Sequence, residues 1–110
     1  MTISELIKKL ELKTVTGNVA EENFDGVYAG DLLSRAMSHV EAGNLWITIM
    51  SNSNVIAVAS LTECAAVILA ESVELMPDAL EAARENGILV LSSDMTVYEL
   101  CVKIGELSHE

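Results

Sequence analysis

Residues 45–70 read LWITIMSNSNVIAVASLTECAAVILA, and this stretch decides the fold. Its two ends, residues 45–50 and 64–70, are short apolar runs rich in the branched side chains that β-strands favour. The segment between them, residues 54–63, could by its residue types be a buried strand or a buried helix. Two parallel neighbours need a crossover of about a dozen residues, and this segment has that length. We therefore predict a helix between two parallel strands.

The rest of the chain carries start signals for four more helices. Thr2-Ile3-Ser4-Glu5 and Thr96-Val97-Tyr98-Glu99 both have the form of a capping box. Pro77 suits the first turn of a helix because it has no amide to leave unpaired. Helices are predicted over residues 3–10, 31–42 and 77–86 and from residue 97 onward, with Asp31 as the N-cap of the second and Ser53 or Asn54 as the cap of the crossover helix.

Strands and helices alternate along this chain. Three further strands are expected at residues 12–16, 26–29 and 88–91, and residues 20–25 are expected to form a loop. Such alternation is typical of an α/β fold with a parallel sheet. At 110 residues the chain is long enough for one domain of this kind. We predict a single three-layer α/β domain over residues 1–110, with a mainly parallel central sheet flanked by helices.

Half of the chain is apolar, while its charges are mostly acidic. Apolar residues make up 51%, the mean hydropathy is +0.39 and the formal net charge is −11. So much apolar surface in a small domain favours self-association, and we expect a homodimer. The scattered Lys and Arg residues argue against nucleic acid and anionic membranes as partners, since both bind through clustered cations. Because we find no signal sequence and no apolar run of about 18 residues, we expect a cytoplasmic location.

The predicted crossover helix, residues 54–63, is apolar nearly all round. One face should cover the sheet, and the other should need a second cover. We expect a partner subunit to supply it. The candidate interface residues are Val55, Val58 and Ala59, with Trp46 in the preceding strand. The two cysteines, Cys64 and Cys101, have apolar neighbours and are expected to be buried reduced thiols.

Polar residues follow the three clearest strands, at residues 51–54, 71–72 and 92–94. Parallel strand ends meet on one edge of a sheet, where α/β proteins bind their ligands. The candidate ligand-binding residues on this edge are Tyr28, Asp31, Asn52, Asn54, Ser72 and Asp94. Helix capping competes with ligand binding as the role of Asp31, Asn54 and Asp94.

No catalytic, cofactor or metal motif accompanies these residues. We find no nucleophile paired with a base, no cluster of metal ligands at a suitable spacing, and neither a GxGxxG nor a Walker pattern. We therefore predict no catalytic residue, no cofactor and no resident metal ion, and we do not expect an enzyme.

Several segments, taken in order, resemble the stand-alone members of the DRTGG-domain family. They are Thr16-Gly17, GVYAGDLLS at 26–34, LWIT at 45–48, NVIAVASL at 54–61 and LSSD at 91–94. The resemblance covers nearly the whole chain. It implies a compact α/β module, similar in fold to the N-terminal domain of HPr kinase, that often dimerises and regulates rather than catalyses. Larger relatives carry the domain within phosphotransacetylases and between the CBS domains of certain pyrophosphatases.

The residues that give the family its name are replaced in this chain. Asn52-Ser53-Asn54 stands where Asp-Arg-Thr would precede the crossover helix, and Glu71-Ser72 stands where Gly-Gly would follow the next strand. Without the arginine and the glycines the edge lacks a cation and a close backbone approach, which argues against phosphate binding.

Hypotheses from three classes are kept. The favoured one is a non-catalytic, homodimeric regulatory or interaction module with a protein partner in a metabolic complex. Its link to energy or redox metabolism is implied by the resemblance, since relatives are often encoded near hydrogenase subunits. The alternative is a sensor that binds a nucleotide-type metabolite at the strand-end edge. A third hypothesis, a metal-dependent hydrolase, requires Asp31 and Asp94 to share one ion.

Overall fold

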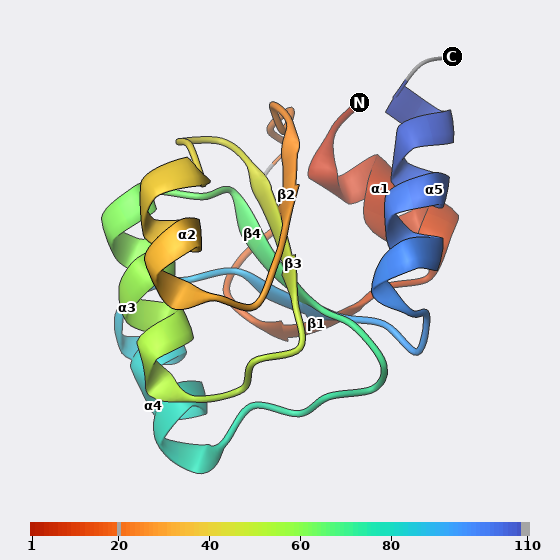
Figure 1. Cartoon of the computed structure of the whole chain (residues 1–110). Coiled ribbons are helices and arrows are strands. Elements are labelled where there is room, and N and C mark those ends of the chain that lie inside the picture. Colours follow the sequence, from red (N-terminus) through yellow and green to blue (C-terminus); the bar gives the residue numbers. More distant parts are fainter. Residues whose placement is uncertain (20, 109–110) are drawn as a thin grey trace.

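The computed structural model describes residues 1–19 and 21–108, and within them a five-stranded sheet lies between two layers of helices (Figure 1). The strands are β1 (Lys13–Thr16), β2 (Val27–Ala29), β3 (Leu45–Thr48), β4 (Ala66–Leu69) and β5 (Val90–Ser92). Their order across the sheet is β1-β5-β4-β3-β2. Strands β2 to β5 are parallel neighbours, and β1 pairs antiparallel with β5. The predicted three-layer α/β class with a mainly parallel sheet is confirmed.

The helices divide between the two faces of the sheet. α1 (Ile3–Leu10) and α5 (Val97–Ser108) cover one face, while α2 (Leu33–His39), α3 (Ser53–Thr62) and α4 (Pro77–Glu85) cover the other. Because β2 to β5 follow one another across the sheet, crossovers of one hand place their helices on the same face. The ambiguous segment after β3 is a helix, as predicted. Among the described residues, none of these helices is long and apolar enough to cross a membrane.

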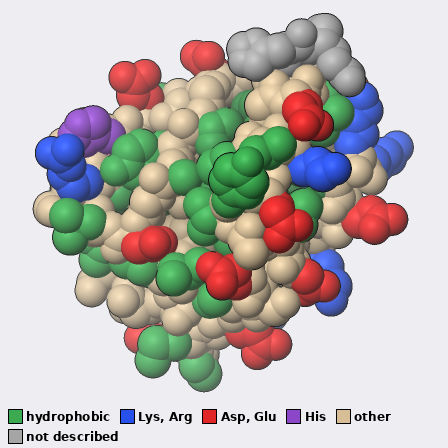
Figure 2. All heavy atoms as spheres, turned by 45° about the vertical axis from the view of Figure 1, so that its right-hand side comes forward, with side chains coloured by type: hydrophobic (Ala, Val, Ile, Leu, Met, Phe, Trp, Pro, Cys, Tyr) green, Lys and Arg blue, Asp and Glu red, His purple; other side chains and the backbone are tan. Residues whose placement is uncertain are grey.

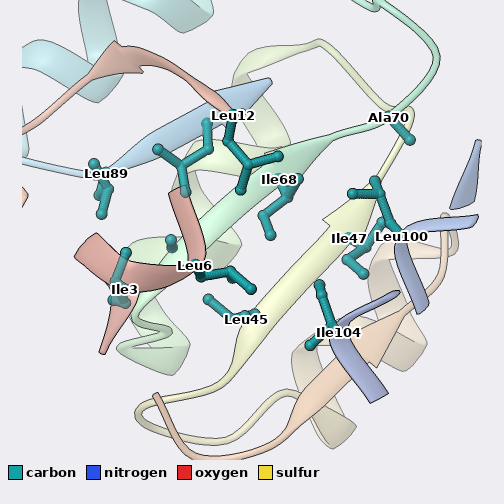
Figure 3. Packing of buried hydrophobic residues seen from close by; sticks show 12 residues of the cluster. Ile3, Leu6, Leu12, Leu45, Ile47, Ile68, Ala70, Leu89, Leu100 and Ile104 are labelled. Carbon is teal, nitrogen blue, oxygen red and sulfur yellow. The ribbon is translucent and has the colours of Figure 1, made fainter. Parts of the chain in front are cut away.

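β3 and β4 form the centre of the sheet, and every residue in them is buried. Leu45 and Ile47 point toward α1 and α5, where Leu6 and Ile104 close over them (Figure 3). Trp46 points the other way, into the layer of α2, α3 and α4. A strand covered on both faces shows no polar side to water, which explains the unbroken apolar runs in the sequence.

Both predicted capping boxes are formed. The Glu5 amide donates to Thr2 Oγ1 (3.1 Å), and the Thr2 amide donates to the Glu5 carboxylate (3.1 Å). Thr96 and Glu99 make the same exchange before α5, with distances of 3.3 and 3.1 Å. In the first of these capping boxes, the hydrogen bond from the Thr2 amide stabilises the charged form of the Glu5 carboxyl group and so lowers its pKa.

Several helix boundaries differ from the prediction by a few residues, as at the start of α3 and the end of α2. The cap of α3 is Asn52, whose Oδ1 accepts from the Asn54 amide (3.0 Å), rather than Ser53 or Asn54. α2 ends at His39 instead of residue 42, because Val40 is already extended. In the expected loop over residues 20–25, residue 20 lies outside the described residues, and the others form neither helix nor strand apart from one isolated bridge.

The second cover of α3 comes from the chain itself. α3 lies between α2 and α4, and its inner residues belong to the same buried cluster as theirs. The four candidate interface residues, Trp46, Val55, Val58 and Ala59, are at most 3% exposed. They therefore lie in the core rather than on the surface, because neighbouring helices fill the place assigned to a partner. The exposed apolar side chains of α3 are instead Ala57 and Leu61.

The two cysteines are free thiols that are half-buried rather than fully buried. Cys64 lies in the turn between α3 and β4, where burial raises the pKa of its thiol to about 11. Its neutral form is therefore favoured by folding.

We expect Cys64 to make the fold sensitive to alkali. Since folding raises the pKa of this thiol from 9.0 to about 11, its contribution to stability is complete below pH 9 and is lost as the pH rises through 11. The loss should be at most about 3 kcal/mol, because each unit of pKa corresponds to about 1.4 kcal/mol. Urea unfolding of the wild type and of Cys64→Ala measures it, and the wild type should lose more stability across this interval. Equal losses would contradict the prediction.

Candidate functional site

The carboxyl ends of the parallel strands lie along one edge of the sheet, in the order β5, β4, β3, β2. The segments that follow these strands carry, in the same order, Asp94, Ser72, Asn52 and Asp31. Hydrogen bonds tie these polar side chains to one another or to nearby backbone. The pattern of these bonds decides what the edge can offer to a ligand.

Asp31 is predicted to cap α2, and this prediction is wrong. The cap position is held by Leu32, which makes no side-chain hydrogen bond to the helix. Asp31 Oδ1 accepts instead from Thr48 Oγ1 (2.8 Å) and from the Ile49 amide (3.0 Å), at the end of β3. Thr48 is fully buried, and its hydroxyl oxygen also accepts from the Met50 amide (3.2 Å). Asp31 therefore holds the ends of β2 and β3 together. Thr48 was not predicted from the sequence as a residue of this edge.

Ser72 and Asp94 are in direct contact, as Ser72 Oγ donates to Asp94 Oδ1 (2.7 Å). Two backbone bonds run beside this one, from the Glu71 amide to the Met95 carbonyl (2.8 Å) and from the Ser72 amide to the Ser93 carbonyl (2.9 Å). Glu71 and Ser72 both have left-handed backbones, with φ of 58° and 60°. The loop after β4 is thus fixed to the loop after β5, in a conformation that glycine would adopt at lower cost.

A hollow of about 380 Å³ opens beside this pair. Its lining includes Ser72 and Asp94 together with Glu11 and Lys13 from the beginning of the chain. β1 is antiparallel to β5 and pairs Lys13 with Ser92, which brings the start of β1 to the edge where the other strands end. The volume is in the range of small-molecule sites, which begin at roughly 300 Å³.

The charge of this hollow favours neutral or cationic ligands. Three carboxyl side chains of its described lining, Glu11, Glu74 and Asp94, stand against one lysine, Lys13. A phosphate group would meet more repulsion than attraction there. Glu11 and Lys13 could not be placed from the sequence, because β1 joins the edge only through a pairing of residues far apart in the chain.

The other predicted ligand-binding residues do not line this hollow. Asn52 caps α3, and Asn54 lies exposed in the first turn of that helix. Tyr28 turns toward the helix layer, where its ring stacks on His39 of α2 with the ring centroids 6.1 Å apart. Gly30 makes room for that ring, since a Cβ there would come within 3.1 Å of it. Of the six predicted residues, the structure therefore brings Ser72 and Asp94 together in this hollow.

Asp31 and Asp94 belong to opposite ends of the edge. β3 and β4 separate β2 from β5, so three strand spacings, roughly 14 Å, lie between the two strand ends. In the described part of the chain, no three His, Cys, Asp or Glu side chains gather as metal ligands would. Each carboxylate instead accepts a hydrogen bond from a hydroxyl group beside it, an arrangement that favours two separate structural roles over a shared ion.

Comparison with known proteins identifies the family. The family model of the DRTGG domain matches residues 5–107, so the chain belongs to the DRTGG domain family. A similar solved structure holds the CBS and DRTGG domains of the regulatory region of Clostridium perfringens pyrophosphatase, complexed with the activator diadenosine tetraphosphate. The TM-score is 0.69 at 11% sequence identity, which is a likeness of fold; the match covers 89% of this chain and 43% of the other. No curated protein matches the chain.

The positions at which the sequence departs from the family's name residues lie in the loop after β4 and at the start of α3. Glu71 and Ser72, which stand in place of the family's paired glycines, are the residues with left-handed backbones. Asn52-Ser53-Asn54, in place of Asp-Arg-Thr, still begins and caps α3 but provides no cation. The loop after β4 thus has a left-handed backbone at both positions, and the start of α3 brings no cation to the edge.

We expect the role of Asp31 to depend on its reach toward β3. Asp31→Ser should lower the free energy of unfolding by about 2 kcal/mol, because serine is too short to accept from the buried Thr48 hydroxyl. Asp31→Asn keeps an oxygen acceptor at the same place and should cost less than half as much. Both are measured by urea unfolding. Serine caps helices as well as aspartate does. If Asp31→Ser were as stable as the wild type, Asp31 would therefore act as a helix cap, and its bond to Thr48 would not stabilise the fold.

Proposed function

We propose that this chain is a non-catalytic regulatory or interaction module that acts as a homodimer in the cytoplasm. Its membership of the DRTGG family, and its likeness to a domain in the regulatory region of a pyrophosphatase, support a regulatory role. The observation that supports the non-catalytic role is the hydrogen bonding of the two carboxylates at the strand ends. Asp31 and Asp94 each accept a hydrogen bond from a neighbouring hydroxyl group, and they follow strands that β3 and β4 separate.

The proposed setting is energy or redox metabolism, with a protein partner in a metabolic complex. It is supported by the family resemblance and by the pyrophosphatase that contains the similar domain. The domain would act there by changing how its partner assembles rather than by chemistry of its own.

We place the second copy of the homodimer on the exposed face of α3. No charged residue occurs in this helix, although the whole chain has a net charge of −11. Two copies would therefore meet here with the least repulsion between like charges. Leu61 is 71% exposed, Ala57 lies one turn before it, and Met37 of the adjacent α2 is 48% exposed. A two-fold contact would pair such a face with itself.

We expect sedimentation equilibrium at micromolar concentration to give twice the monomer mass of 11.8 kDa. Leu61→Lys should give a folded monomer, because the charge enters the contact without touching the core. Val58→Lys is the matched comparison one turn earlier. Val58 is 3% exposed, so an unpaired cation there should destabilise the fold by about 3 kcal/mol or more. A monomeric wild type would overturn the dimer, and a dimeric Leu61→Lys would overturn the placement on α3.

A metabolite sensor is the second candidate function, and the hollow beside Ser72 and Asp94 is the observation that favours it. Its size suits a small ligand, whereas its carboxylates disfavour the phosphates of a nucleotide. The hollow therefore supports a small-molecule sensor better than it supports a sensor of nucleotides.

Thermal unfolding in the presence of millimolar AMP, adenosine or diadenosine tetraphosphate separates the two functions. The interaction module predicts no rise in Tm. A sensor predicts a rise, since a ligand at about 100 times its Kd stabilises the folded state by about 3 kcal/mol. That rise should vanish in Lys13→Ala or Ser72→Ala, which change the lining, and persist in Leu61→Lys, which lies on α3. Such a result would replace the module with the sensor.

A further inference from the structure

The two edges of the sheet differ in how they are protected. β1 carries the charged Lys13, and its pairing with β5 is broken by a bulge between Thr14 and Thr16. Charges and bulges are devices that keep other chains from adding to an exposed edge. β2 reads Val27-Tyr28-Ala29 and pairs with β3 in unbroken register, with no charge, proline or bulge. One edge is therefore closed to strand addition and the other is open.

The backbone of β2 presents hydrogen-bonding groups away from the sheet. Gly26 O accepts from the Leu45 amide (3.0 Å), and the Gly30 amide donates to Ile47 O (3.1 Å), so the even-numbered residues face β3. Alternate residues of a strand bond in opposite directions. The amides and carbonyls of Val27 and Ala29 thus point outward, and both residues are exposed. An added strand would find these four groups ready to pair.

A hollow of about 780 Å³ lies beside this edge. Val27 and Ala29 line it on one side, and Ile104, Gly105 and Leu107 of α5 line it on the other. The space in front of Gly105 is open, since nothing lies within 4 Å of where its Cβ would be. Figure 2, which brings the α5 side forward, shows apolar side chains gathered in the middle of this face, with both acidic and basic side chains around them. Every second side chain of an added strand would have an apolar place to enter.

The charged side chains that line this hollow or flank β2 are acidic. Glu5 lines the hollow, and two more carboxylates come in the short segments next to β2, Asp25 before it and Asp31 after it. A second copy of the chain, with its net charge of −11, would bring like charges to this place. A segment carrying Lys or Arg would bring the opposite charge.

We infer that β2 and the hollow beside it bind an extended segment of a partner protein, in which apolar residues alternate with Lys or Arg. The segment adds to β2 as a sixth strand, places its apolar side chains in the hollow toward α5, and directs its cations to the acidic rim. This inference rests on the proposed role as an interaction module, and it leaves the exposed face of α3 to the homodimer.

Selection from a display library of random linear peptides of about ten residues, the upper length of common strands, tests the inference on the full chain. The expected winners alternate apolar residues with Lys or Arg. Ala29→Pro removes one outward amide without touching the bonds to β3, and should weaken their binding by at least about tenfold. Val27→Lys should weaken it similarly through repulsion, whereas Leu61→Lys, with the same charge change on α3, should leave it unaltered.

Two readouts do not depend on how these variants fold. Hydrogen exchange of the Ala29 amide should slow when a selected peptide binds, and N-methylation of alternate peptide amides should abolish binding. Selection of no peptide, of peptides without this alternation, or of peptides that bind Val27→Lys and Leu61→Lys equally would overturn the inference. So would a homodimer that Ala29→Pro dissociates, since the occupant would then be a second copy. A dimer sensitive to Leu61→Lys, together with no peptide binding, would leave the proposed function standing and remove this inference alone.

Discussion

The parallel pairing of β3 with β4 is the constraint on which the rest of the structure depends. All residues of both strands are buried, so apolar layers must cover the sheet on each side. The chain must also cross from the end of β3 back to the start of β4, and α3 is both that crossover and part of one cover. α2 and α4 complete that layer, while α1 and α5 form the other from the two ends of the described chain. Residues from the whole length of the described chain therefore pack against the centre of the sheet.

The strand-end edge is organised as separate pairs rather than as one large pocket. Asp31 joins the ends of β2 and β3, and the bond between Ser72 and Asp94 joins the loops after β4 and β5. In each pair a carboxylate accepts a hydrogen bond from a hydroxyl group of a neighbouring segment. These bonds hold the loops in fixed places, and a module that works through its surfaces needs such fixed places more than it needs reactive groups.

The elements with local signals could be predicted from the sequence. The capping boxes at Thr2 and Thr96 and the proline at residue 77 mark helix starts within a few residues, and all three starts are as predicted. Connectivity decided α3, where composition was ambiguous. The role of Asp31 could not be predicted, because its partner Thr48 lies 17 residues away and an aspartate before a helix suits a cap equally well. The same holds for Val58: the sequence shows an apolar helix, but only the packing of α2 and α4 shows that its flanks are already covered.

The contrast between β1 and β2 has a consequence for how far any assembly of this protein can grow. Continuous fibrils form when both edge strands of every molecule can pair with another molecule, so that each added molecule presents a new free edge. Here the bulge and Lys13 protect the edge at β1. Pairing at β2 therefore occupies the one unprotected edge among the described strands. Assembly by backbone pairing would thus stop after a single step, and a chain as apolar as this one gains protection from runaway polymerisation.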